Sequence, residues 1–451
     1  MVVIGDFAMS NSAPESGFKI KFSDREVSAW GGMALLKRML DQMDFRQAAS
    51  GWDLPPPGSN RGYPPVQLIE QWIVSIWCGA CRFAHAETVR FDGTLTRLFG
   101  WPKAAAYQAI MRLFKRFDMA RNEAVQESVY RWFFAQVSTL KRITLDMDST
   151  VLTRHGEQEG ATRGYNPGRR GRPSHHPLLA FVAEARMVAN FWLRPGNAYT
   201  TNNVLAFIES TLRHLGDKTV GLFRADSGFF DDAILSLLEG RKIDYIISAK
   251  LTQRLQVAIM RDARWWALET GLELAEITYQ AQGWSAPRRI VAVRQSIKRK
   301  AAPGKTLSLF DDDPDLSGWR YGAMVTSLTL PDVEVWRSYR GRADCENRIK
   351  ELKADFGLDS FALNDFWATE AALGFAMLAY NLISLFRQAV LRTKVQPTLT
   401  TLHSQVLAIG ASWHRDANNN TLILSLPRKR RAWFKGLWTR SDDPHIIPVT
   451  T

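Results

Sequence analysis

Apolar residues in the first third of the chain recur every three or four positions, the spacing that places them on one face of a helix. The pattern is clearest over residues 66–83, 104–117 and 124–137. Pro- and Gly-rich segments interrupt it and indicate turns. We therefore predict a helical domain over residues 26–140, preceded by a polar leader over residues 1–25.

The spacing of the apolar residues changes from a helical to a strand-like period at about residue 141. Three strand-like stretches (141–153, 176–188 and 190–196) come first. Helix, strand, helix and strand patterns then alternate over residues 201–251. This order is α/β and matches the layout of an RNase H-like nuclease core, a mixed sheet with flanking helices; a fold likeness of this kind establishes no function.

Two further regions follow this core. Residues 251–335 mix helix and strand signals and are predicted to form a β-rich insertion, so that the core would span 141–250 and resume over 336–395. Within the second part, the apolar run 371–386 is shorter than a bilayer-spanning helix and contains Asn381, which favours a buried core helix. Residues 396–451 are predicted to be a basic C-terminal region used for oligomerisation.

The charge of the chain restricts the classes of binding partner that we expect. Its 451 residues include 58 Lys and Arg against 45 Asp and Glu, a net charge of +13. Such a surplus favours a polyanion as partner, because cations that bind phosphates release condensed counterions. Hydrophobic residues make up 46% of the chain, which excludes global disorder. Three cysteines in so long a chain favour a reducing compartment, and no secretory signal is seen in the sequence. We therefore expect a cytoplasmic protein that is not bound to a membrane.

One segment of the N-terminal domain is compatible with DNA recognition. Residues 95–117 read as a helix, a Gly/Pro turn and a second helix that carries Arg112, Lys115 and Arg116. A helix-turn-helix lying in the major groove has this form. An ordinary amphipathic helix with a solvated basic face fits the pattern equally well.

Two aspartates at strand ends are candidate metal ligands. Asp148 lies in LDMDST and Asp226 in FRADSGF, each after an apolar strand. A sheet fixes the backbone at such positions, and hard divalent cations prefer carboxylate oxygens. Alternatively, Asp148 is a turn residue and Asp226 a helix cap. Asp146 lies on the same strand face as Asp148 and competes with it.

A third motif, YRGRADCENRIKELK, combines one carboxylate with two cations. Arg342, Glu346 and Lys353 are separated by four and seven residues and share one helical face, with Tyr339 just before them. Such a stripe suits the joint binding of a metal ion and DNA phosphates. An exposed helix with an Arg342–Glu346 ion pair is the alternative.

Together these motifs resemble the DDE transposases of bacterial insertion sequences, in the cut-and-paste group with the Y-R-E-K signature. The resemblance extends over about residues 141–390. It implies that Asp148, Asp226 and Glu346 bind two Mg²⁺ ions, replaceable by Mn²⁺, and catalyse cleavage and strand transfer. It also implies that the enzyme acts on the terminal inverted repeats of its own element, as a homodimer on double-stranded DNA, in a bacterial nucleoid.

Further DNA contacts are predicted with less support from the motifs. The resemblance implies that Arg342 and Lys353 hold phosphates and that Tyr339 contacts DNA near the cut. A loop with Arg163, Arg169 and Arg170 is predicted to contact phosphates. Relatives hold a flipped base with a tryptophan of the insertion. The candidates for this role are Trp284 and Trp319, and for both we favour ordinary packing.

The remaining polar motifs have simpler explanations. Cys78, Cys81 and His85 have a zinc-like spacing but no fourth ligand nearby, so buried thiols are favoured. His175 and His176 are expected to face solvent. The tail segment PRKRRAWFKGLW is either a DNA contact or a solvated helix. Two rival functions remain open, namely a repair or junction nuclease without strand transfer and a non-catalytic DNA-binding descendant.

Overall fold

The computed structural model describes residues 22, 24–297, 318–416 and 419–444. Almost all of the predicted leader therefore lies outside the described residues, as does most of the polar segment 298–318. The division of the chain into domains stays a prediction.

The N-terminal part is helical, as the apolar spacing predicts. Its helices are α1 (Met33–Gln42), α2 (Phe45–Ser50), α3 (Pro65–Trp77), η1 (Phe83–Ala86), α4 (Glu87–Arg90), α5 (Gly93–Leu98), α6 (Tyr107–Phe114) and α7 (Met119–Gln136). Pro65 begins α3 at a position where a missing N–H costs nothing. In α6 the apolar face is buried, while Lys115 lies 3.9 Å from Asp365 and Arg116 donates to the carbonyl of Pro56. These partners favour the amphipathic-helix interpretation of the basic cluster.

A nine-stranded mixed sheet follows, in the order β10-β11-β12-β13-β9-β8-β2-β6-β7. Strand β8 pairs in parallel with both β2 and β9, and the other neighbours are antiparallel. The strands are β2 (Arg142–Ser149), β6 (Leu178–Val182), β7 (Met187–Trp192), β8 (Thr219–Ala225), β9 (Asp244–Ser248), β10 (Trp266–Glu269), β11 (Leu272–Tyr279), β12 (Arg288–Ser296) and β13 (Trp319–Thr326). A small sheet, β3-β5-β4, lies in the chain between β2 and β6; its strands are β3 (Leu152–Thr153), β4 (Thr162–Arg163) and β5 (Pro173–His175).

Two predicted strand boundaries are wrong. The stretch 141–153 is not one strand, because β2 ends at Ser149 and the chain then turns into the small sheet. The stretch 176–188 contains a hairpin turn, where Arg186 has a φ of 53° and Glu184 accepts from the backbone N–H of Thr144. Met187 and Val188 therefore begin the third strand.

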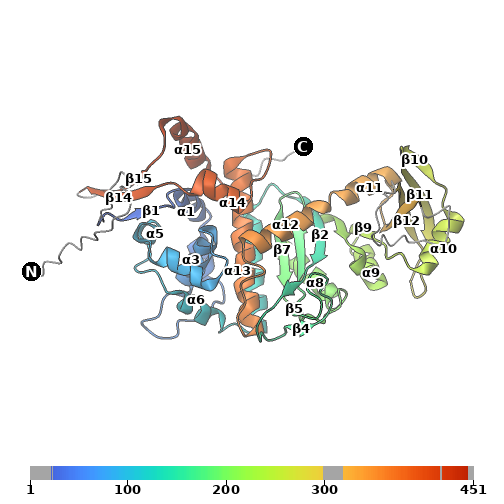
Figure 1. Cartoon of the computed structure of the whole chain (residues 1–451), viewed down its shortest axis with the longest axis horizontal. Coiled ribbons are helices and arrows are strands. Elements are labelled where there is room, and N and C mark those ends of the chain that lie inside the picture. The colour runs from blue at the N-terminus through green and yellow to red at the C-terminus, as the bar shows by residue number, and fades with distance from the viewer. Residues whose placement is uncertain (1–21, 23, 298–317, 417–418, 445–451) are drawn as a thin grey trace, which may run out of the picture.

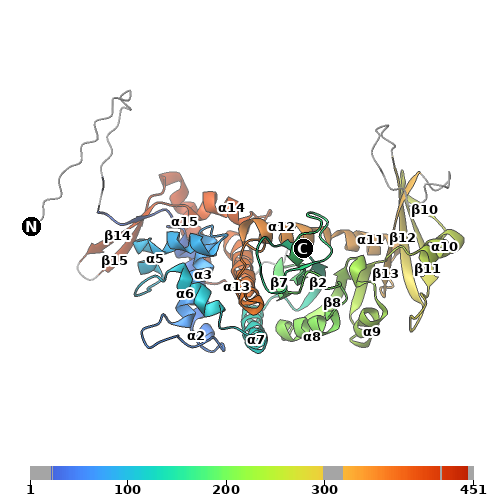
Figure 2. The same cartoon turned by 60° about the horizontal axis from the view of Figure 1, so that its bottom comes forward.

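The predicted insertion is not a separate sheet. Its strands β10–β13 extend the main sheet, because β13 pairs with β9. Its predicted strand patterns are confirmed in β11, β12 and β13, whereas β10 and the helix α10 (Gln253–Asp262) were not foreseen. Figure 2 shows these strands at the end of the molecule opposite the N-terminal helices.

Helices fill the space between and around the strands. They are α8 (Val204–Leu215), η2 (Ser227–Phe229), α9 (Asp232–Gly240), α11 (Asp332–Arg340), α12 (Ala343–Asp355) and α13 (Phe366–Leu385), which continues as η3 (Phe386–Leu391). Figure 1 shows α13 between the N-terminal helices and the sheet. Residues 366–391 are long and apolar enough to cross a membrane, but the apolar window is completely buried within the protein. The core-helix prediction is confirmed.

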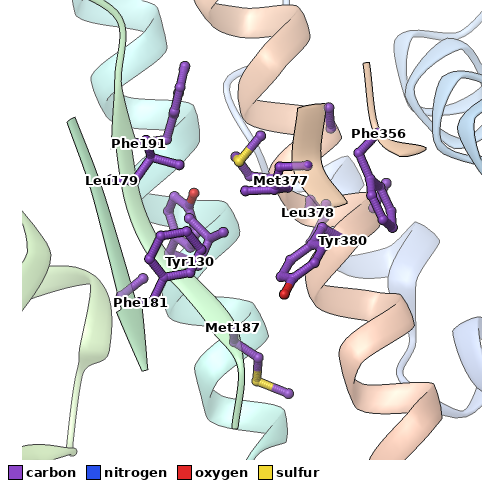
Figure 3. Packing of buried hydrophobic residues seen from close by; sticks show 14 of the residues in the cluster. Tyr130, Leu179, Phe181, Met187, Phe191, Phe356, Met377, Leu378 and Tyr380 are labelled. Atoms are coloured by element: carbon purple, nitrogen blue, oxygen red, sulfur yellow. The ribbon is translucent and has the colours of Figure 1, made fainter. Parts of the chain in front are cut away.

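The main core lies where α7 and α13 pack on β6 and β7. Figure 3 shows Tyr130 of α7, Phe181 of β6 and Met377 of α13 facing this space. All three are at most 1% exposed. Burial of such side chains contributes about 1.5–3 kcal/mol each, so this layer holds the helical part against the sheet.

The C-terminal part returns to the N-terminal helices. It contains α14 (Leu399–Leu402), η4 (His403–Leu407), β14 (Ala411–Asp416), β15 (Asn419–Leu424) and α15 (Arg428–Arg440). Strand β1 (Val27–Ser28) pairs with β14, so the two ends of the chain share a three-stranded sheet.

Asn381 gives a test of how α13 holds the edge strand β7. Its amide oxygen accepts from the N–H of Val188 at 2.7 Å, and its amide nitrogen donates to the carbonyl of Val188 at 2.8 Å. Asn381→Leu would leave both backbone groups buried without partners. We expect a loss of about 2–4 kcal/mol in the free energy of unfolding, measured in urea. The exposed Asn347→Leu should change it by less than about 0.5 kcal/mol.

Candidate active site

The register of β2 and β8 places the two candidate aspartates side by side. Asp146 is opposite Arg224 and Met147 is opposite Ala225, so Asp148 and Asp226 follow at the same end of two parallel strands. Asp148 is 8% exposed. Asp226 follows β8 and its Oδ1 accepts from the N–H of Gly228 at 2.9 Å. Asp226 therefore does cap the following helical turn, as the alternative predicted. The cap uses Oδ1, so Oδ2 can still bind a metal ion.

Asp146 has a different task. Its two oxygens accept from Nε and Nη2 of Arg224, at 2.6 and 2.9 Å, and its side chain is completely buried. Arg224 uses its remaining Nη1 to donate to the carbonyl of Ser338, at 2.5 Å. Asp146 is thus completely buried in a bidentate ion pair that joins β2 to β8, whereas Asp148 lies at the strand end, which favours Asp148 as the first ligand.

Helix α12 brings the third motif against the end of β2. Arg342 precedes α12, is buried, and places Nη2 3.1 Å from Asp148 Oδ2 and 3.3 Å from the carbonyl of Met147. The Sγ of Cys345 lies 4.0 Å from the same carboxylate oxygen. The ion pair between Arg342 and Glu346 is absent from the described residues. Arg342 points into the site rather than along an exposed helix.

Burial and its neighbours change the titration of Asp148. Burial raises the pKa of Asp148 to about 6, Arg342 opposes this rise, and the nearby Asp226 and Glu346 add to it. Asp148 thus lies in the field of two other carboxylates. Like charges gathered around one buried carboxylate are typical of a site for a cation.

The other predicted site residues surround this centre to different degrees. Tyr339, in α11, is half-buried and forms a side-chain hydrogen bond with Ser248; burial raises its pKa. Lys353 donates to the carbonyl of Val151 at 2.9 Å and lies 3.8 Å from Asp359.

A cavity of about 990 Å³ opens beside the centre. Lys353, Asp226 and Arg169 line it. Arg163 and Arg170 are exposed on the same loop region but do not line the cavity. Of the three loop arginines that were predicted to contact phosphates, only Arg169 lines the cavity beside the carboxylates.

Sequence reasoning missed Arg154, which lines the same cavity. Its Nε donates to Nδ1 of His175 at 3.1 Å, and Nε2–H of His175 donates to the carbonyl of Glu159 at 2.9 Å. Nη2 of Arg154 is buried without a hydrogen-bond partner in the described structure. The expectation that His175 and His176 face solvent is wrong, because both are buried, and burial lowers the pKa of His175 to about 4. The small sheet β3-β5-β4, which a local pattern does not reveal, encloses them.

The two candidate tryptophans, Trp284 and Trp319, are packed against other side chains. Trp284 contacts Phe230 and has the guanidinium of Arg288 5.1 Å above its ring. Trp319 stacks on Arg294, at 4.6 Å. Neither lines the cavity, although Phe230 places Trp284 near the segment that carries Asp226. Their contact with DNA stays a prediction.

The zinc-like spacing has little support in the geometry, and the expectation of buried thiols is wrong as well, because Cys78 and Cys81 are both partly exposed. The Sγ of Cys81 lies 3.5 Å from His85 Nδ1. Across the described residues, no three His, Cys, Asp or Glu side chains are already grouped as metal ligands. Asp148 and Asp226 at the strand ends and Glu346 of α12 are not grouped in this way either; Arg342 contacts Asp148, and the N–H of Gly228 donates to one oxygen of Asp226.

Carboxylates at the ends of parallel strands, beside a cationic cavity, are typical of metal-dependent enzymes that act on phosphodiesters. The chain belongs to the family described as transposase DDE domain, group 1, whose profile matches residues 12–438. It is therefore a DNA transposase, of a family that uses divalent metal ions. No match was found among curated proteins. A cryo-EM structure of a piggyBac transposase synaptic complex with hairpin DNA is similar at 12% identity and a TM-score of 0.41, covering 85% of this chain and 81% of that chain.

The titration of Asp148 tests the geometry of this site. In the metal-free protein, Asp226→Asn should lower the pKa of Asp148 below about 6, and Arg342→Gln should raise it. Carboxyl ¹³C NMR titration measures both shifts, with the exposed Glu334→Gln as control. A pKa near the ordinary 3.8 in the unaltered protein would contradict the burial and clustering.

The same shift has a defined effect on stability. The folded state holds this proton more tightly than the unfolded chain, whose pKa is near 3.8. The contribution of Asp148 to stability is therefore present below pH 3.8 and is lost as the pH rises through about 6. Asp148→Asn should remove this part of the pH dependence in urea unfolding.

Proposed function

We propose that Asp148, Asp226 and Glu346 hold two Mg²⁺ ions, or Mn²⁺ in their place, and catalyse cut-and-paste transposition of the element that encodes the protein. The observation that carries this proposal is the parallel pairing of β2 with β8, which sets Asp148 beside Asp226 under α12. The order β7-β6-β2-β8-β9, with its antiparallel half and parallel half, supports an RNase H-like core.

The donor set fits the metal. All three side chains offer carboxylate oxygens, which hard divalent cations prefer. Two bound ions would activate the attacking hydroxyl and stabilise the leaving oxygen. Asp148 must be ionised to act as a ligand, and Arg342 keeps it so by opposing the rise in its pKa.

The cations around the centre would position DNA. Arg342 and Lys353 flank the carboxylates and are suited to the phosphates on either side of the cut, while Tyr339 lies close enough to act electrostatically with Asp148 and Asp226. Arg169 and the unpartnered Nη2 of Arg154 extend the cationic lining into the cavity. Such contacts position the backbone and carry no sequence information of their own.

The remaining parts of the function are also proposals. Recognition of the terminal inverted repeats is assigned to the N-terminal helices, and pairing of two ends to a homodimer. An enzyme acting on chromosomal DNA in bacteria would be associated with the nucleoid in the cytoplasm.

Substitution of the carboxylates tests the catalytic assignment. Asp226→Asn should reduce cleavage of a transposon end by about 10⁴-fold or more, since removal of a group central to the chemistry has such effects. End binding in a gel-shift assay should persist. Glu334→Gln, an exposed carboxylate on α11, is the matched control and should cleave normally. Normal cleavage by Asp226→Asn would refute the assignment.

A second substrate separates transposition from simple hydrolysis. Pre-cut ends with a free 3′-hydroxyl, mixed with target DNA and Mg²⁺, should be joined to the target by the unaltered protein. Cleavage of intact ends without any joining would identify a repair or junction nuclease on the same core. Binding of ends without cleavage would identify a non-catalytic descendant.

Metal binding can be followed without activity. We expect Mn²⁺ titrated into the protein–DNA complex to show two bound ions per chain by electron paramagnetic resonance. Asp226→Asn should abolish at least one of them, and Glu334→Gln should retain both. Identical binding by Asp226→Asn and the unaltered protein would remove Asp226 from the ligand set.

A further inference from the structure

The exposed face of α15 carries cations that the catalytic site does not use. Arg428, Lys429, Arg431 and Lys435 are exposed, whereas Phe434 and Leu437 are buried. Trp433 and Trp438 are each 38% exposed on the same helix. Both views show α15 on the side of α13 that carries the N-terminal helices, away from β2 (Figures 1 and 2).

Throughout the described part of the chain, none of the four exposed cations forms an ion pair with a carboxylate. Arg431 donates only to a backbone carbonyl, that of Leu426, at 3.2 Å. Two nearby carboxylates, Asp442 and Asp443, follow the helix, and Asp442 is paired with Arg38. Among the described residues, the positive charge on this face is therefore uncompensated.

This arrangement is electrostatically unfavourable for an isolated helix. Arg428, Lys429 and Arg431 lie in the first turn, which has no acidic residue, although the N-terminal end of a helix is positive and favours anions. Arg431 and Lys435 are like charges four residues apart, a destabilising spacing. At the other end, Arg440 has its pKa lowered by burial and by repulsion from Arg392. A bound anion would relieve each of these conflicts.

The chemistry of the surface distinguishes between polyanions. A basic amphipathic helix binds a membrane by inserting its apolar face. In α15 that face is already used, because Phe434 and Leu437 are buried and the helix packs on η3. What remains outside is a group of cations, since Arg430 already stacks on Trp433 and Arg38 on Trp438, and such a cationic surface suits the phosphates of a nucleic acid.

We infer that the exposed face of α15 binds the phosphate backbone of double-stranded DNA, as a second DNA-binding surface apart from the catalytic cavity. This inference rests on the proposed function only in that DNA is the partner. We expect α15 to bind DNA of any sequence, because its first turn offers charge and backbone N–H groups for phosphates. It lacks the set of side chains that usually recognise base edges.

The salt dependence of DNA binding tests this inference. The variant combines Arg428→Gln, Lys429→Gln, Arg431→Gln and Lys435→Gln. The slope of the logarithm of the binding constant against the logarithm of salt concentration should become less steep, by up to about 3.6 if all four cations contact phosphates. Cleavage at saturating enzyme should persist, because none of the four lies near the carboxylates.

A charge-matched control accompanies the variant. Arg142, Lys242, Arg254 and Arg264 are exposed, form no ion pair within the described residues, and lie outside both α15 and the N-terminal helices. Changing these four to Gln alters the net charge equally and should affect the slope much less. Equal slopes for the unaltered protein and the α15 variant, or equal losses in both variants, would overturn the inference. Failure of the unaltered protein to bind DNA would instead refute the proposed function.

Chemical protection gives the same test without any substitution. Acetylation of Lys429 and Lys435 should be suppressed by a random-sequence duplex, whereas the exposed Lys242 should react as before, as read by mass spectrometry. Vesicles containing phosphatidylserine provide the membrane comparison. Protection by vesicles but not by duplex DNA would overturn the inference in favour of a lipid surface.

Discussion

The buried ion pair between Asp146 and Arg224 is the interaction on which the active-site geometry depends. It joins two parallel strands that are far apart in sequence, and Arg224 extends it to the carbonyl of Ser338 in α11. Gly341 permits this approach, because a Cβ there would lie 2.8 Å from Arg224 Nη1. The pair thus fixes both the register that sets Asp148 beside Asp226 and the start of α12. Removal of one partner would leave a buried charge, at a cost of about 3–5 kcal/mol.

The positive charge of the chain has several separate tasks. Some cations are structural, such as Arg224 and Arg288, whose guanidinium groups are almost completely buried among carboxylates or carbonyls. Others surround the proposed catalytic carboxylates, and a further group on α15 has no carboxylate partner among the described residues. A net charge of +13 predicts a polyanion but says nothing of this distribution. The distinction requires the ion pairs, and these depend on contacts between distant segments.

The sequence pattern identified the elements that are determined by their own residues rather than by contacts with distant segments. The helix at α13 was predictable because nearly every position is apolar, and the strand ends at Asp148 and Asp226 because apolar runs stop there. Strand β10 was missed because its four residues are mostly exposed and show no alternation. The burial of His175 depends on a small sheet of non-local pairs. The roles of Asp146 and Asp148 could not be separated, because two residues on one strand face differ only in what the neighbouring strand places opposite them.

Arg342 links the two ligands that the proposed enzyme must bind. Its guanidinium pairs with Asp148 in the metal-free protein, and the same buried group would be available to a phosphate at the cut. A phosphate that draws Arg342 away would leave Asp148 with Asp226 and Glu346, whose repulsion then favours a divalent cation more strongly. A metal ion on Asp148 would in turn release Arg342 toward the phosphate. Coupling between two binding events is reciprocal, so DNA and metal should each raise the affinity for the other.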